Sequence, residues 1–347
     1  YTDEDWWQGP DPLLHIHLAQ GLRALVIAPA TADLISDLAH GKSDRLLTAT
    51  ALAAGGPLLL APAMDGGMYA HPATQDNLAL LRAHGAILLG PAQGHLASGL
   101  VSLGRMSEPE EILGELRWQL AQGGPLAGRN IVVTAGGTQE PIDSARIITN
   151  RSSGKQGYAL AQAALDAGAM VTLISAPTSL SAPYGANVVR VRTAEEMQER
   201  VLQSTIGADA LLMAAAVSDF RPEQGAGQKI KREAGPIHLV LEPTEDILRA
   251  VAERRTRTGF PRAVIGFAAE DRDLIENAAK KVNEKSLEFI VANDISAADA
   301  GFEVDTNRVS LVFPDGHIER WPLMSKEEVA TRIVSKLAGL LPSVDGG

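Results

Sequence analysis

Short apolar segments alternate with helix-forming segments along almost the whole chain, and this alternation constrains the fold most. In the first third, the apolar runs 23–30, 57–64 and 84–92 are predicted strands, and residues 32–41 have helical spacing. Apolar strands separated by helices are typical of a parallel sheet covered on both faces. Each of these strands ends in a loop that contains proline. Loops at the carboxyl ends of such strands are where ligands bind.

A second series of alternating segments follows a Gly- and Pro-rich stretch. Residues 109–122 predict an amphipathic helix that closes the first domain, whereas residues 123–129 lack apolar periodicity and predict a linker. The second domain is expected over residues 130–341, before a tail at 342–347. Its predicted elements are strands at 130–136, 170–176, 187–193, 210–216, 263–269 and 288–294, helices at 153–168, 194–204, 244–255, 271–286 and 325–340, and a hairpin at 307–321 that turns at Pro314, Asp315 and Gly316. The sequence therefore predicts an α/β protein with two doubly wound, Rossmann-like units.

The composition excludes several classes of protein. The 347 residues carry a formal net charge of −11, which argues against general nucleic-acid binding, because that needs clustered positive charge. There is no cysteine, which excludes disulfides and thiolate sites within this chain and fits a cytoplasmic protein. No apolar run reaches the ~18 residues that cross a bilayer, so no membrane association is expected. The acidic N-terminus has neither an initiator Met nor an apolar signal core, and we expect a fragment or a processed product.

The stretch 149-TNRSSGKQG-157 follows an apolar strand and the pair Gly136 and Gly137, an order typical of phosphate binding. A P-loop requires Ser or Thr after Gly-Lys, and here Gln156 stands there. A dinucleotide-binding turn holds its glycines within one tight loop, but about 17 residues separate the two glycine clusters here. The backbone N–H groups of residues 136–138 and 152–154 are candidate donors to an anion.

Lysines beside glycine-rich turns are the next candidates. Lys281 and Lys285 are four residues apart on one helix face, a spacing that repels unless an anion lies between them. Lys229 and Lys231 lie in a Gly-rich loop. Any one of them is most simply a solvated surface lysine, but together they can surround a triphosphate. Asp219 ends an apolar strand, where it is either a turn residue or a carboxylate for a metal ion or nucleotide.

At this point six segments, taken in order, closely resemble the ligase half of a known family. They are TAGGTQEPIDSARIITNRSSGKQG, AAAVSDFRP, KIKR, GFAAE, KKVNEK and AND…GFEVDTN, spread over residues 129–341. The family is the bacterial bifunctional phosphopantothenoylcysteine decarboxylase/phosphopantothenate–cysteine ligase of coenzyme A biosynthesis. The first domain resembles the decarboxylase half through HIHLAQ, IAPATADL, APAMDGGMYAHPATQDN and SLGRMSEPEEI.

The resemblance implies a ligase reaction with CTP and Mg²⁺. The carboxylate of 4′-phosphopantothenate attacks the α-phosphate of CTP, pyrophosphate leaves, and the cysteine amine then displaces CMP from the acyl-cytidylate. Asn150 is implied to act on the acyl-cytidylate, Lys229 to serve catalysis and bind the CTP phosphates, and Asp219 to bind nucleotide and metal. The other implied CTP positions are Met213, Ala214, Ala215, Glu245, Asp246, Ile247, Leu248, Phe267, Lys281 and Lys285, and the expected substrate loops contain Gly136, Gly137, Ser152 and Ser153.

For the first domain, the resemblance implies a truncated flavodoxin-like flavoprotein that binds FMN if complete and decarboxylates phosphopantothenoylcysteine. His15 matches the family's active-site histidine. Two positions depart from the family pattern. Asp65 replaces a substrate-binding Asn, and Ser98 replaces a proton-donating Cys. A serine is a far weaker acid than a thiol, so these positions indicate a decarboxylase that is altered, inactive or retuned.

Two alternatives stay open. A NAD(P)-binding Rossmann oxidoreductase would need an acid after the second strand of the second domain, and that strand ends ISAPTSL instead. A non-catalytic assembly module is the other alternative. The family resemblance further implies a homo-oligomer, with dimers of the ligase domain and trimers of the flavoprotein domain.

Overall fold

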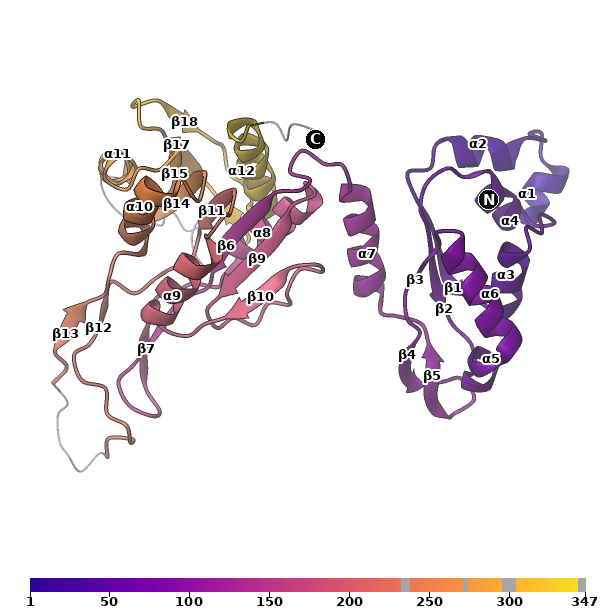
Figure 1. The fold of residues 1–347 in the computed structure, drawn as a ribbon, viewed down its shortest axis with the longest axis horizontal. Helices are drawn as coiled ribbons and strands as arrows, with labels where there is room; N and C mark the ends of the chain where they lie inside the picture. Colours follow the sequence, from indigo (N-terminus) through magenta and orange to yellow (C-terminus); the bar gives the residue numbers. More distant parts are fainter. Residues whose placement is uncertain (232–237, 271–273, 295–303, 343–347) are drawn as a thin grey trace. The chain divides into compact units, whose positions relative to one another are not determined.

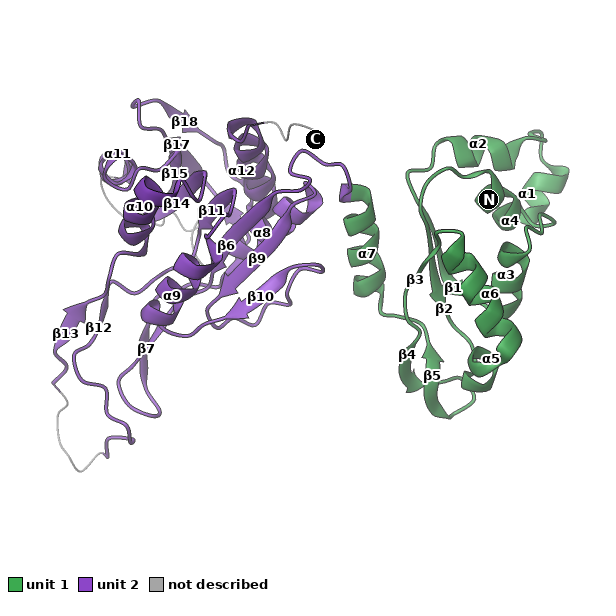
Figure 2. Ribbon diagram, in the orientation of Figure 1, with its two compact units in different colours: residues 1–120 green, residues 121–347 purple. Residues whose placement is uncertain are grey.

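The computed structural model describes residues 1–231, 238–270, 274–294 and 304–342, and it divides the chain into two compact units, Tyr1–Leu120 and Ala121–Gly347 (Figures 1 and 2). Some predicted features lie outside the described residues: Arg232 of KIKR, residues 271–273 of a helix, residues 301–303 of GFEVDTN, and the tail from 343 onward. Residues 123–129, predicted as a linker, belong to the second unit. Leu126 there is fully buried and donates its N–H to the carbonyl of Ala167 at 2.8 Å.

The first unit is built on a parallel sheet of β1 (Leu25–Ala30), β2 (Leu58–Pro62) and β3 (Ile87–Leu88), in that order. Successive side chains of a strand point to opposite faces. On β2, Leu60 packs in a cluster with α3 (Ala32–Ala39) and α6 (Pro72–Ala83), while Leu59 packs with α7 (Pro109–Ala121). Helices therefore cover both faces of this sheet, as predicted.

Several short elements of the first unit were not predicted from the sequence. Helical and strand patterns of only four to eight residues carry little periodicity, so they are easily missed. They are the helices α1 (Asp3–Gln8), α2 (Leu14–Gln20), α4 (Leu46–Ala53) and α5 (Gly66–Ala70), and an antiparallel hairpin of β4 (Ala92–His95) and β5 (Val101–Arg105).

The second unit contains an eight-stranded sheet in the order β10-β9-β6-β11-β14-β15-β17-β18. The first six are parallel, and β17 and β18 form the predicted antiparallel hairpin. The bounds are β6 (Asn130–Ala135), β9 (Met170–Ser175), β10 (Asn187–Arg190), β11 (Ala210–Met213), β14 (Ala263–Glu270), β15 (Phe289–Asp294), β17 (Val309–Val312) and β18 (Ile318–Arg320). The predicted α/β class with doubly wound units is confirmed.

Helices cover both faces of this sheet as well (Figure 1). One face packs against α9 (Ala194–Ser204), α10 (Ile247–Thr258) and α11 (Leu274–Glu284), whose side chains share a buried cluster with β6, β11, β14 and β15. The long helices α8 (Lys155–Asp166) and α12 (Lys326–Leu340) contact each other, and α8 contacts β6 and β9. Among the described residues, no helix has the length and apolar character needed to cross a membrane.

Short strand pairs extend from this framework. They are β7 (Gln139–Pro141) with β8 (Ile147–Thr149), β12 (Phe220–Pro222) with β13 (Leu241–Pro243), and β16 (Thr306–Asn307) with β19 (Met324–Ser325). The turn between β7 and β8 contains the buried Asp143, whose carboxylate accepts from the N–H groups of Ala145, Arg146 and Ile230. The hairpin is thereby fastened to the segment around Ile230.

The strand order defines where a ligand binds. Numbered along the chain, the six parallel strands lie in the order 3-2-1-4-5-6, with the first strand β6 beside the fourth strand β11. The connections leave β6 and β11 in opposite directions, and a crevice opens between them at the carboxyl end of the sheet. Helix α8 packs closely there, because a Cβ at Gly157 would lie only 2.6 Å from the Cβ of Ala135.

Candidate functional site

Two adjoining cavities lie at the carboxyl ends of β11, β14 and β15, beside the N-terminus of α8. The larger cavity has a volume of about 570 Å³ and the smaller cavity about 360 Å³. They share a wall, to which β11 and the loop after it, β14 and α11 all contribute. The residues common to both are Ala215, Val217, Asp219, Phe267 and Lys281. A ligand with two parts can therefore extend from one cavity into the other.

The smaller cavity brings together most of the positions predicted to bind the nucleotide. They come from β11 and the loop after it, the start of α10, β14 and α11. The predicted residues that line it are Met213, Ala215, Asp219, Glu245, Asp246, Ile247, Leu248, Phe267, Lys281 and Lys285, while Ala214 lines the larger cavity. Segments up to about 70 residues apart in sequence thus meet at the site where the strand order reverses.

An ion pair explains how Lys281, on α11, and Lys285, directly after its end, tolerate their spacing. The ammonium of Lys285 lies 2.8 Å from a carboxylate oxygen of Asp246, which also accepts from the N–H of Arg249 as the N-cap of α10. Burial raises the pKa of Asp246, but Lys285 and the helix N–H groups outweigh burial and hold the pKa below its usual value. The anion beside Lys285 is therefore a protein carboxylate.

Asp219 is exposed and borders both cavities. Its backbone carbonyl accepts from the N–H of Thr244 at 2.9 Å, which fixes the loop after β11. The described residues contain no cluster of three or more His, Cys, Asp or Glu side chains able to hold a metal ion. Mg²⁺ is commonly bound by one or two carboxylates together with substrate phosphates. Asp219 fits that kind of site, in which the nucleotide supplies the remaining ligands.

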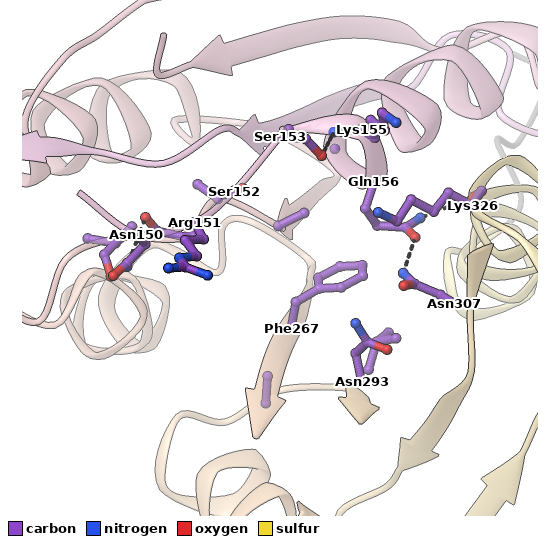
Figure 3. Close-up of a pocket in the computed structure, with 18 of the residues that line it drawn as sticks. Asn150, Arg151, Ser152, Ser153, Lys155, Gln156, Phe267, Asn293, Asn307 and Lys326 are labelled. Atoms are coloured by element: carbon purple, nitrogen blue, oxygen red, sulfur yellow. Dashed lines mark hydrogen bonds between the residues drawn. The ribbon is translucent and has the colours of Figure 1, made fainter. Parts of the chain in front are cut away.

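The larger cavity is bordered by the predicted loop before α8, including Asn150, Ser152 and Ser153 (Figure 3). The side-chain amide of Asn150 donates to the carbonyls of Ala216 and Val217, at 3.3 and 3.0 Å. Asn150 therefore ties this loop to the end of β11. Donation to a bound substrate would require it to exchange one of these hydrogen bonds.

Gly136 and Gly137 do not line either cavity, which differs from their predicted place in a substrate loop. Gly136 has a φ of +82°, and a Cβ there would lie 2.9 Å from the carbonyl oxygen of Ala176. The N–H of Thr138, offered as a donor to an anion, already donates to the carbonyl of Ala216. These glycines allow close backbone packing at the end of β6.

Lys229 does not line either cavity, and its role at the phosphates stays a prediction. Its neighbour Ile230 donates its N–H to Asp143 at 3.2 Å and accepts from the guanidinium of Arg146 at 3.3 Å. These contacts hold Lys229 on the arm that carries β12 and β13 (Figure 1). This clamp could not be predicted from the sequence, because Asp143 and Ile230 are far apart along the chain.

A polar end of the larger cavity was missed from the sequence. Figure 3 draws Gln156, Asn293, Asn307 and Lys326 on one side of Phe267, with Asn150 on the other. Asn293 and Asn307 stand in the quoted motif AND…GFEVDTN, but no role was given to them. Lys326 was predicted only as part of the helix at 325–340. A signal that could have found the two asparagines is their place along the chain, with Asn293 near the carboxyl end of β15 and Asn307 just before β17, the strand that pairs with β15.

In the first unit, Asp65 and Ser98 meet in a separate cavity of about 340 Å³. The Ser98 hydroxyl donates to Asp65 at 2.7 Å, and the N–H of Gly67 donates to the same carboxylate at 3.0 Å. These hydrogen bonds lower the pKa of Asp65, so its carboxylate is ionised near neutral pH.

His15 does not line this cavity. It lies on α2 with its ring centroid 5.2 Å from that of Trp6, and its Nδ1 is buried without a partner among the described residues.

Two family models match the chain, one for each unit. Residues 1–119 match the Flavoprotein family, and residues 126–340 match the C-terminal domain of the DNA/pantothenate metabolism flavoproteins. The second match spans most of the chain and contains both adjoining cavities.

Similar whole proteins and a similar solved structure agree with these matches. The coenzyme A biosynthesis bifunctional protein CoaBC of Bacillus subtilis is 43% identical over 98% of this chain and 84% of its own length. A cysteine/cysteine sulfinic acid decarboxylase of an unknown prokaryote is 40% identical over 94% of this chain and 92% of its own length. The crystal structure of the C-terminal domain of a CoaBC protein superimposes with a TM-score of 0.53 at 37% identity, covering 62% of this chain and 97% of that domain.

Proposed function

The chain belongs to the family of coenzyme A biosynthesis bifunctional proteins, and from this premise we propose that its second unit is a CTP-dependent phosphopantothenate–cysteine ligase. The family predicted from the sequence motifs is thereby confirmed, as is an enzyme of coenzyme A biosynthesis. The use of CTP, the Mg²⁺ ion and the residue roles are parts of the proposal.

The proposed reaction has two steps in one continuous site. The carboxylate of 4′-phosphopantothenate attacks the α-phosphorus of CTP and expels pyrophosphate. The amine of cysteine then attacks the acyl carbon of the resulting acyl-cytidylate and expels CMP. Because negative charge develops on phosphate oxygens, lysine ammonium groups and a metal ion held by Asp219 are suited to stabilise both transition states.

The observation that carries the proposal is the wall shared by the two cavities. The nucleotide is assigned to the smaller cavity, where Lys281 and Lys285 face it beside Asp219. The acyl group is assigned to the larger cavity, beside Asn150 and Ser152. Phe267 borders both cavities, so the acyl-phosphate bond is expected at that point.

The experiment measures pyrophosphate release with 4′-phosphopantothenate and Mg²⁺, with CTP or ATP, and with or without cysteine. The ligase proposal expects release with CTP and a CMP turnover that rises when cysteine is added. Absence of release with either nucleotide, from protein whose circular dichroism shows it to be folded, would favour the assembly-module alternative. The oxidoreductase alternative has no support at β9, because Ser175 and Ala176 stand where a ribose-binding acid is required.

For the first unit we propose a flavin site whose decarboxylase chemistry is altered. The buried, unpartnered Nδ1 of His15 fits a hydrogen-bonding group of a ligand beside α2. FMN, when bound, supplies the electron acceptor for oxidation of a cysteinyl thiol. An ionised Asp65 would repel a substrate carboxylate, so phosphopantothenoylcysteine is a poor substrate on this account. Titration with FMN, followed by flavin fluorescence, tests the cofactor separately from the chemistry.

Cytoplasmic location and oligomeric state are further parts of the proposal. The cysteine-free sequence and the small-molecule substrates favour the cytoplasm. Dimers of the second unit and trimers of the first are expected on the family resemblance. Light scattering of the purified chain tests the assembly.

A further inference from the structure

At the polar end of the larger cavity, the backbone carbonyl of Lys326 determines how the side-chain amides of Gln156 and Asn307 are oriented. The side-chain nitrogen of Gln156 donates to the carbonyl oxygen of Lys326 at 3.2 Å. A backbone carbonyl only accepts, so the Gln156 amide has its nitrogen toward it and its own oxygen toward Asn307. That oxygen in turn accepts from the side-chain nitrogen of Asn307 at 2.9 Å.

These two hydrogen bonds use the side-chain nitrogens of Gln156 and Asn307 and leave the Asn307 Oδ1 without a partner among the described residues. Because the nitrogen of Asn307 faces Gln156, its Oδ1 is turned the other way. Asn307 is only 4% exposed, and its Oδ1 is buried with no partner among the described residues. The Oδ1 of Asn293, near the carboxyl end of β15, is likewise buried with no partner among the described residues. Both residues line the larger cavity (Figure 3). Buried polar atoms without a protein partner are costly, so two such acceptors in one cavity indicate a ligand that donates.

Positive charge lies at the same end. Lys155 lines the cavity, and its ammonium pairs with the exposed Asp305 at 2.5 Å. Lys326 is 5% exposed, and its side chain runs from the start of α12 toward Gln156 (Figure 3). A phosphate dianion fits poorly beside Asn293 and Asn307, because their two amide oxygens would repel it.

The combination fits one group with an ammonium and a carboxylate. We propose that this end of the larger cavity is the subsite for the α-amino acid substrate, with its ammonium at the Asn293 and Asn307 oxygens and its carboxylate at Lys155. The proposal rests on the proposed ligase function and assigns its second substrate. Val291 and Val309 provide an apolar wall for a small side chain such as the thiol-bearing methylene of cysteine.

Lys326 is suited to prepare the amine. Burial lowers the pKa of Lys326 to about 8, with the charge of Lys155 acting in the same direction and Asp305 opposing it. The neutral lysine amine accepts one proton from the substrate ammonium. The freed lone pair then forms the C–N bond to the acyl carbon, and the C–O bond breaks with its electron pair on the phosphate of CMP. The remaining surplus proton on nitrogen leaves to solvent.

The test separates the two half-reactions. Exchange of pyrophosphate into CTP, with 4′-phosphopantothenate and without cysteine, reports the first step alone. The KM for cysteine reports the second substrate. In Asn293→Ala we expect a rise of about tenfold or more in the KM for cysteine, because a charged donor loses its acceptor, with the exchange rate unchanged. Lys280→Met, on an exposed side chain of α11, is the matched control and should alter neither quantity.

Lys326→Met provides a second, independent variant. Its rate of amide formation is expected to fall, and the increase of that rate as the pH rises toward about 8 is expected to disappear. Lys326→Arg keeps the positive charge but cannot act as a base near pH 8, so it separates the effect of charge from the effect of proton transfer. Lys155 and Asp305 are the charged groups that influence Lys326, and Lys281 borders the same cavity from α11. Their variants serve to assign the pH profile.

Three results are distinguishable. An unchanged KM for cysteine in folded Asn293→Ala overturns the amino acid subsite. A raised KM for 4′-phosphopantothenate, with the KM for cysteine unchanged, also overturns it and assigns this end to the other substrate. Absence of both exchange and amide formation in the unsubstituted protein instead contradicts the ligase function on which the proposal rests.

Discussion

The two units share a doubly wound plan, but the polar end of the larger cavity in the second unit differs from the Asp65 cavity of the first. In the second unit, Asn293 and Asn307 turn buried acceptors into a cavity without a partner among the described residues. In the first unit, Asp65 and Ser98 also border a cavity, yet they hydrogen-bond to each other. Polar groups that await a ligand mark a site prepared for binding, whereas paired groups must first be separated. The comparison therefore favours activity in the second unit and altered chemistry in the first.

The largest expected effect concerns the wall shared by the two cavities. Lys281→Ala should lower kcat of the ligase reaction by about a hundredfold, because it removes a cation placed at developing phosphate charge. Steady-state kinetics with CTP measure this effect. The matched control is Lys280→Ala on the same helix, where the side chain is 74% exposed. Equal losses in the two variants would show that the cavity position of Lys281 does not matter.

The second prediction tests whether Asp65 and Ser98 cause the altered chemistry proposed for the first unit. Asp65→Asn combined with Ser98→Cys removes the negative charge and supplies a thiol acid, so decarboxylation of phosphopantothenoylcysteine should rise by about tenfold or more. Carbon dioxide release from protein supplied with FMN measures it. Cysteine sulfinic acid, named in one relative, is the comparison substrate. A double variant no more active than the unsubstituted chain would show that Asp65 and Ser98 do not cause the low decarboxylase activity expected of the first unit.

The third prediction tests the close packing that forms the second unit's site. A Cβ at Gly157 would lie 2.6 Å from the Cβ of Ala135 and 2.8 Å from the carbonyl oxygen of Thr134. Gly157→Ala should therefore cost about 1–3 kcal/mol of unfolding free energy, seen in urea denaturation. Gly339→Ala is the control, since a Cβ there contacts nothing within 4 Å, and it should stabilise α12 slightly. A neutral Gly157→Ala would mean that α8 can move away from β6.

The smallest effect concerns the clamp on the arm. Burial opposes ionisation of Asp143, but the N–H groups of Ala145, Ile230 and Arg146 and the Arg146 guanidinium lower its pKa to about 2 from the usual 3.8. Its folded pKa lies below the unfolded value. Its contribution to stability is therefore fully present above about pH 4 and is lost as the pH falls through about 2.

Asp143→Asn should flatten this acid dependence in thermal unfolding followed between pH 2 and pH 5. The same variant should loosen the segment around Ile230, which hydrogen exchange at its N–H reports. If the variant retains the acid dependence of the unsubstituted chain, another carboxylate causes it.

The sequence predicted the sheet well and the site in part, for physical reasons. Hydrophobic periodicity predicts strands such as 210–216 and helices such as 194–204. The structure has β11 and α9 at these positions. The positions predicted to bind the nucleotide lie in continuous motifs at strand ends, and most of them line one cavity. The contact of Ile230 with Asp143 and the close approach of Gly136 to Ala176 could not be predicted, because both join segments far apart in the sequence. The roles of Asn307 and Lys326 depend on hydrogen bonds to Gln156, which no local pattern records.

The central claim is that the second unit joins its substrates through an acyl-cytidylate. The most direct measurement uses 4′-phosphopantothenate labelled with ¹⁸O in its carboxylate, with CTP, Mg²⁺ and cysteine, followed by mass spectrometry of the nucleotide product. The account predicts that one labelled oxygen appears in the phosphate of CMP. Label in inorganic phosphate alongside CDP, or an amide formed with no label in CMP, would contradict it.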